Sequence, residues 1–92
     1  MSQVKSAHIQ IFGFVQGVYY RGSALKKANE LNLGGFTRNC PDGSVEILAT
    51  GEEEKIKQLI EWCRQGPPAA KVSNVVVKWQ ETDVPNRNFK VM

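Results

Sequence analysis

The sequence has 92 residues, a length that suits one small domain, and we expect residues 1–92 to form a single domain. Its 41% of hydrophobic and 23% of charged residues are ordinary for a globular protein. No segment approaches the ~20 apolar residues of a membrane span, and the start does not resemble a signal peptide, so we expect a cytoplasmic protein without a membrane partner. The net charge of +3 comes from scattered Lys and Arg residues, which argues against a nucleic-acid partner and favours small anions.

The first half of the chain predicts a strand, a glycine-bearing loop and a helix. Apolar residues alternate over 6–12, as in a strand with one buried face. Apolar residues at helical spacing then predict a helix within 22–33. Ser23 could cap this helix, or the helix could begin earlier, with Arg21 in its first turn. Asn32 suits the left-handed residue that ends a helix.

Turn residues bound the remaining predicted elements. Together with the first strand and helix, these elements give an order of strands and helices that is typical of a known fold. In chain order we expect a strand over 36–39, a turn over 40–43, a strand over 44–50, a helix over 52–65, a strand over 71–80, a turn over 83–86 and a short strand over 88–91. The order βαββαβ, with a short terminal strand, is that of the ferredoxin-like α+β sandwich. Right-handed crossovers place both helices on one face of an antiparallel sheet of four to five strands.

Several familiar chemistries are excluded by the residues themselves. Gly13 and Gly17 lie four apart, which fits neither the Walker A loop nor the dinucleotide-binding pattern G-x-G-x-x-G. Cys40 and Cys63 form no C-x-x-C pair, and neither has the arginine six positions later that cysteine phosphatases require, so we expect two free thiols. His8, the only histidine, lies within the first strand, where a sheet-lining role is favoured over a catalytic one. We therefore expect no metal and no cofactor, and any activity must rest on anion binding and positioning.

Two segments of the chain resemble the signatures of the acylphosphatase family. The stretch GFVQGVYYR, Gly13–Arg21, matches the pattern G-x-V-Q-G-V-x-[FY]-R, and NCPDGSVE, Asn39–Glu46, matches a strand-ending Asn followed by x-x-D-G-x-V-E. A softer match is GPPAAKV, Gly66–Val72. The resemblance runs from about residue 7 to the end of the chain, and it identifies the chain as similar to the small free-standing members of the family.

The resemblance implies metal-independent hydrolysis of the carboxyl–phosphate bond of small acyl phosphates, which yields a carboxylate and inorganic phosphate. It also implies that Arg21 clamps the phosphate and that Asn39 positions the attacking water. The phosphate would be cradled by the backbone N–H groups of Val15, Gln16, Gly17, Val18, Tyr19 and Tyr20. The physics agrees, because successive N–H groups at a helix start attract anions and a guanidinium binds phosphate oxygens in pairs.

Other interpretations remain open at this stage. Asn39 could instead cap the Pro-Asp-Gly turn, and the Tyr20 side chain is favoured as a packing residue over a substrate contact. The fold also serves non-catalytic nucleic-acid or protein-binding modules, although Gly35-Phe36-Thr37-Arg38 matches the RNA-reading motif poorly. A further alternative is a domain that serves a larger maturation or carbamoyl-transfer machine. Because the chain ends with the domain, we expect a free-standing enzyme. We also expect it to be a monomer.

Overall fold

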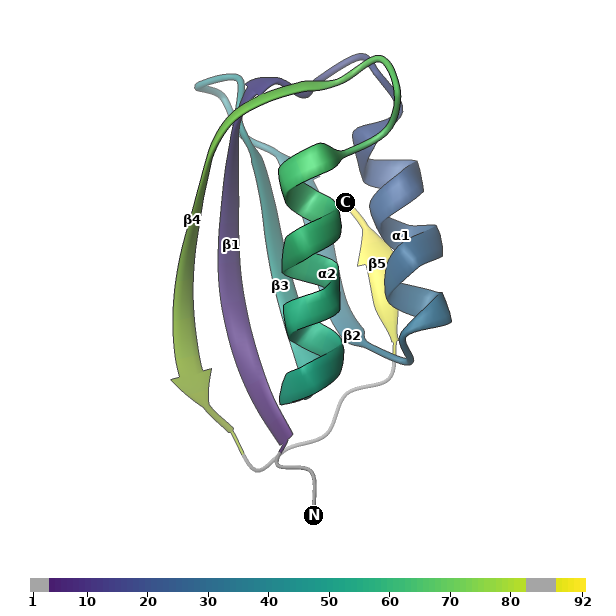
Figure 1. Cartoon of the computed structure of the whole chain (residues 1–92), viewed down its shortest axis with the longest axis vertical. Helices are drawn as coiled ribbons and strands as arrows, with labels where there is room; N and C mark the ends of the chain where they lie inside the picture. Colours follow the sequence, from purple (N-terminus) through teal and green to yellow (C-terminus); the bar gives the residue numbers. More distant parts are fainter. Residues whose placement is uncertain (1–3, 83–87) are drawn as a thin grey trace.

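The structure, a computed structural model, describes residues 4–82 and 88–92 (Figure 1). Its elements, in chain order, are β1 (Val4–Phe14), α1 (Tyr20–Glu30), β2 (Gly34–Asn39), β3 (Val45–Glu52), α2 (Glu53–Gln65), β4 (Lys71–Glu81) and β5 (Phe89–Val91). The predicted βαββαβ order with a short terminal strand is confirmed. The turn predicted over 83–86 lies outside the described residues. No helix in the described part of the chain is long and apolar enough to span a bilayer.

The five strands form one sheet in the order β4-β1-β3-β2-β5. The four strands of the ferredoxin-like unit pair antiparallel, as predicted, but β5 runs parallel to β2, with Phe89 opposite Gly35. The sheet is therefore mixed, and the expectation of a purely antiparallel sheet is corrected at this edge. A three-residue strand carries no sequence signal for the direction of its partner, and β5 starts at the end of the sheet where β4 finishes.

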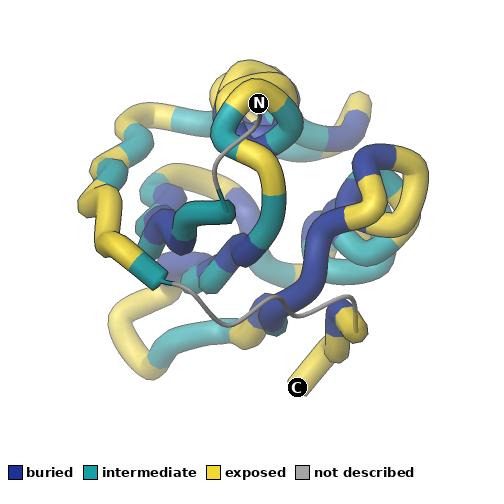
Figure 2. The backbone as a smooth tube through the Cα atoms, turned by 90° about the horizontal axis from the view of Figure 1, so that it is seen from below, coloured by how far each residue is buried: buried dark blue, intermediate teal, exposed yellow. Residues whose placement is uncertain are grey.

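Both helices cover one face of the sheet, and the core lies between the two layers (Figures 1 and 2). The inward residues of β1, which are Ala7, Ile9 and Ile11, are fully buried there. The apolar side of α2 contributes the buried residues Ile56, Leu59, Ile60 and Cys63. The thiol of Cys63 is in the core as expected, and burial raises its pKa to about 12. The opposite face of the sheet has no helix over it in the described residues.

The strand β1 is longer than the predicted range 6–12, and its far end directs the chain into the glycine loop. Its pairing with β4 shifts between Phe12 and Gly13. Gly13 has φ 127°, and a Cβ atom there would lie 2.2 Å from the carbonyl oxygen of Lys71. Only glycine allows the two strands to approach this closely in this conformation. The bulge therefore bends β1 at the point where the loop begins.

Helix α1 begins at Tyr20, so the earlier of the two predicted starts is correct. Arg21 lies in its first turn, and the backbone N–H of Ser23 donates to the carbonyl of Tyr19 at 3.1 Å. Tyr19 precedes the helix in a left-handed conformation with φ 64°. At the other end Asn32 has φ 57°, as predicted for the residue that terminates this helix.

Candidate active site

The loop between β1 and α1 presents a run of unpaired backbone donors. Gly17 (φ 76°) and Tyr19 (φ 64°) turn the chain through left-handed conformations. Within the described chain, the N–H groups of residues 16–19 donate to no protein acceptor. The first N–H groups of a helix also lack partners inside the helix, and no side chain caps the start of α1. Such a run of donors at the positive end of a helix dipole forms an anion site.

A hollow of about 370 Å³ lies between this loop, the start of α1, the end of β2 and β5. It is lined by Val15, Gly17, Tyr19, Tyr20, Arg21, Gly22, Asn39 and Val91. Arg21 and Asn39 come from the two separate signatures of the sequence and meet here. Of the other residues predicted for the site, Gln16 and Val18 do not line the hollow. Gly22 and Val91 were not predicted, and Val91 reaches the hollow only because β5 pairs with β2.

The guanidinium of Arg21 is held in place by the main chain beyond β5. Its Nη1 donates to the backbone oxygen of Met92 at 2.7 Å. One guanidinium carries five N–H donors, so this bond fixes the group and leaves other donors for a ligand. The arrangement gives the hollow a permanently positive group that one exposed hydrogen bond connects to the main chain.

Asn39 ends β2 with its side chain on the same face of the sheet as the helices. Its Oδ1 is buried and accepts no hydrogen bond from the described residues. The turn that follows is organised by Asp42 instead, whose carboxylate accepts from the backbone N–H of Ser44 at 2.9 Å and from its hydroxyl at 2.6 Å. These hydrogen bonds, that of the hydroxyl most of all, lower the pKa of Asp42. The Asn39 side chain is therefore an unpaired buried acceptor, a costly arrangement unless a water or ligand uses it.

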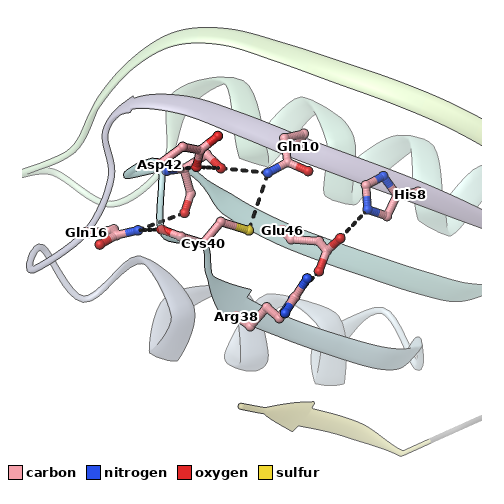
Figure 3. Close-up of polar contacts among 8 residues, drawn as sticks. His8, Gln10, Gln16, Arg38, Cys40, Asp42 and Glu46 are labelled. Carbon is pink, nitrogen blue, oxygen red and sulfur yellow. Dashed lines mark hydrogen bonds and ion pairs between the residues drawn. The ribbon is translucent and has the colours of Figure 1, made fainter.

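Gln16 ties the loop to the hairpin that carries Asn39. Its Nε2 donates to the carbonyl of Cys40 at 2.8 Å and to that of Ser44 at 2.9 Å (Figure 3). The sequence analysis assigned only the backbone of Gln16, and it missed this side-chain role. The only signal in the sequence is a long amide side chain within a short glycine loop. This signal does not indicate which groups accept its hydrogen bonds.

Tyr20 anchors the start of α1 to α2. Its ring is buried and lies 5.3 Å from that of Trp62, and its hydroxyl donates to the carbonyl of Cys63 at 2.7 Å. Burial raises the pKa of Tyr20 well above its ordinary value. The packing role favoured for this side chain is what the structure shows. Val18 is likewise packed against the core, so these two residues could act on an anion only through their backbone.

A polar cluster lies on the face of the sheet that the helices do not cover (Figure 3). Glu46 on β3 accepts from Nε2 of His8 on β1 at 2.5 Å and from Arg38 on β2. The hydrogen bond from His8, followed by that from Arg38, lowers the pKa of Glu46. His8 thus lines the sheet, as predicted. The described residues contain no group of three or more His, Cys, Asp and Glu side chains placed to hold a metal ion.

Comparisons with known proteins agree with the resemblance. Residues 7–91 match the family model described as Acylphosphatase. The curated Acylphosphatase of Methylococcus capsulatus is 49% identical over 75 residues, which are 82% of each chain. The solved structure of an acylphosphatase from Coxiella burnetii is 40% identical, with a TM-score of 0.91 over 98% of this chain and 94% of that one. Full-length HypF in its phosphate- and nucleotide-bound form matches all of this chain with 12% of its own, at 27% identity and a TM-score of 0.85.

Proposed function

We propose a role for each residue of the hollow from one premise: the chain belongs to the acylphosphatase family and hydrolyses the carboxyl–phosphate bond of acyl phosphates. The phosphate binds to the backbone N–H groups of Val15 to Tyr20, and Arg21 clamps its oxygens. The observation that carries this assignment is the run of N–H groups without protein acceptors in the loop that lines the same hollow as Arg21.

Asn39 positions the attacking water in this proposal. Its buried, unpaired Oδ1 accepts a hydrogen bond from the water, and its amide group stays neutral at every physiological pH. The water oxygen bonds to phosphorus as the bond from phosphorus to the carboxyl oxygen breaks. Phosphoryl transfer through a loose transition state needs mainly positioning and charge stabilisation.

The leaving group needs no general acid. A carboxylate has a pKa of about 4, so it departs with the bonding electron pair and without a proton. The proton of the attacking water passes to an oxygen of the substrate's own phosphate, which leaves as inorganic phosphate. Among the described residues, none that lines the hollow has an imidazole, a carboxylate or a thiol side chain, and this proposal requires none.

The same proposal takes residues 1–92 as one domain that acts as a monomer in the cytoplasm on small acyl phosphates.

The test of the activity is an assay with acetyl phosphate and benzoyl phosphate in excess EDTA, with p-nitrophenyl phosphate as the ester control. We expect rapid, EDTA-resistant hydrolysis of both acyl phosphates and none of the ester. A protein that binds inorganic phosphate but turns over neither acyl phosphate would be the non-catalytic binding module instead.

The role of Asn39 is tested by Asn39→Ala. We expect kcat to fall by about 10²–10³, the typical cost of one well-placed polar group, because the water is no longer oriented. Inhibition by inorganic phosphate should be largely retained, since Asn39 holds the water rather than the phosphate. Asn29→Ala, at an exposed position of α1, is the matched control. Loss of phosphate inhibition in Asn39→Ala would show that this residue binds the phosphate itself.

A further inference from the structure

Large hydrophobic side chains are exposed at and beside the hollow. Tyr19 and Val91, which are among the residues that line the hollow, are 76% and 43% exposed. Met92, beside Val91, is 64% exposed, while its backbone oxygen holds Arg21. Single exposed apolar side chains are ordinary, but apolar side chains gathered around one hollow mark a binding surface.

The ring of Tyr19 lies against the first turn of α1. The residue adopts φ 64°, which is uncommon for an aromatic residue. Its ring rests on Gly22, where an added Cβ atom would lie 2.5 Å from Cε1 and Cζ of the ring. The phenol hydroxyl makes no hydrogen bond with the described residues. Tyr19 also lines a second hollow, together with Lys27 and Trp62, so this residue is shared by the two.

We propose that the side chains of Tyr19 and Val91 form the subsite for the acyl group, and that this subsite favours apolar, bulky acyl groups over acetyl. The inference rests on the proposed placement of the phosphate. With the phosphate in the loop beside Arg21, the acyl group extends along the hollow toward Tyr19 and Val91, which also line it. A flat aromatic acyl group packs against the ring of Tyr19 and against the methyl groups of Val91, whereas acetyl is too small to reach both.

This contact acts on binding rather than on the chemical step. The acyl group touches the same side chains in the ground state and in the transition state, so the preference is expected in KM and not in kcat. The backbone of Tyr19 belongs to the phosphate loop, and a substitution there can also affect all substrates equally. The informative quantity is therefore the ratio of kcat/KM for benzoyl phosphate to that for acetyl phosphate.

The test compares this ratio in the unmutated protein, Tyr19→Asn and Tyr19→Phe. Asparagine tolerates a positive φ, so Tyr19→Asn removes the ring with little added backbone strain. We expect the ratio to fall about five- to tenfold in Tyr19→Asn, through KM for benzoyl phosphate, and to stay unchanged in Tyr19→Phe. A smaller fall is expected for Val91→Thr. The control is Val76→Thr, on the open face of the sheet, where the side chain is 41% exposed.

A second measurement does not depend on turnover. Phenacylphosphonate and acetonylphosphonate are unreactive analogues of benzoyl and acetyl phosphate, and the ratio of their inhibition or binding constants should fall in Tyr19→Asn by the same factor. An unchanged ratio in Tyr19→Asn, with either pair of compounds, would overturn the subsite. Absence of acyl phosphate hydrolysis by the unmutated protein would instead contradict the catalytic roles, and the phosphonate ratio would still decide the subsite.

Discussion

Arg21 combines a fixed position with donors left over for a ligand, because only one of its N–H groups is bonded to the Met92 oxygen. We expect Arg21→Lys to lose about 10²–10³ in kcat/KM although it keeps the charge, because an ammonium group lacks the planar fork that can hold this oxygen and a phosphate together. The measurement is steady-state kinetics on acetyl phosphate, with Arg64→Lys at the end of α2 as the control. Full activity in Arg21→Lys would mean that charge alone suffices.

Gln16 is expected to position Asn39 through the hairpin that its side chain holds. Gln16→Met keeps the length of the side chain but removes both hydrogen bonds, and Gln16→Glu places a carboxylate against two carbonyl oxygens. We expect the free energy of unfolding to fall by roughly 1–3 kcal/mol, with the larger loss in Gln16→Glu.

The kinetics of these variants separate a positioning role from a merely structural one. If Gln16 acts through Asn39, kcat should fall in both variants while the inhibition constant of inorganic phosphate changes little. Gln65→Met, at the end of α2, serves as the control. A rise in the phosphate inhibition constant without a fall in kcat would show that Gln16 shapes the phosphate loop alone.

The two signature segments could be recognised from the sequence alone. The contacts that bring them together could not. The spacing of Gly13 to Arg21 and the turn chemistry after Asn39 are local, so the sequence displays them directly. The bonds from Gln16 to Cys40 and Ser44 join segments that are distant in the chain. Such bonds depend on the final register of β1 and β3, which no local pattern contains.

Among the elements, the start of α1 illustrates why a binding site is hard to predict from helix signals. Capping residues such as Ser23 are the usual sign of a helix start, because they satisfy the first N–H groups. Here the helix begins at Tyr20 without a side-chain cap, which leaves those N–H groups for a ligand. The strongly periodic helix α2 begins at Glu53, within one residue of the prediction.

Strand β3 is linked to both of its neighbours by Glu46, which makes this carboxylate sensitive to acid. Its folded-state pKa is lowered by the hydrogen bonds from His8 and Arg38, so its stabilisation is complete above the ordinary carboxylate pKa of about 4.3 and is lost as the pH falls through the lowered value. We expect Glu46→Gln to be less stable than the unmutated protein at neutral pH, with a difference that shrinks toward pH 3.

Urea unfolding of Glu46→Gln and of the unmutated protein, at several pH values between about 7 and 3, measures this difference. Glu54→Gln, in the exposed first turn of α2, is the control. A difference that stays constant over this range would mean that the ion pairs of Glu46 contribute through packing and not through charge.

For the whole molecule, we expect a simple dependence of rate on pH, because the described residues that line the hollow include no histidine, carboxylate or thiol. We expect kcat to be nearly constant between about pH 6 and 8, the range in which a catalytic histidine would titrate. The measurement is kcat at saturating acetyl phosphate, with His8→Gln as the test of the only histidine. A step in kcat with a pKa near 6.5 that disappears in His8→Gln would contradict the proposed mechanism.

The general architecture could be predicted from hydrophobic residues that recur every two residues in strands and every 3.6 residues in helices. The parallel pairing of the last strand could not. Alternation identified the first strand, helical spacing identified both helices, and the order of the elements indicated the ferredoxin-like unit. The parallel pairing of Phe89 with Gly35 adds a wall of the hollow through Val91. That pairing depends on the path of the chain around the sheet, which short-range periodicity does not describe.

The strand order has a consequence for how the protein comes to be active. The first strand lies inside the sheet, and its Ile11 pairs with Val45 and with Val75. Both of these residues are synthesised much later than Ile11. Such non-local pairing typically slows folding to the millisecond-to-second range. The hollow also needs Val91, so a nascent chain can hold the complete phosphate loop and still lack one side of its catalytic pocket. Recovery of enzymatic activity during refolding would therefore report the docking of the last strand, after most of the helical signal has returned.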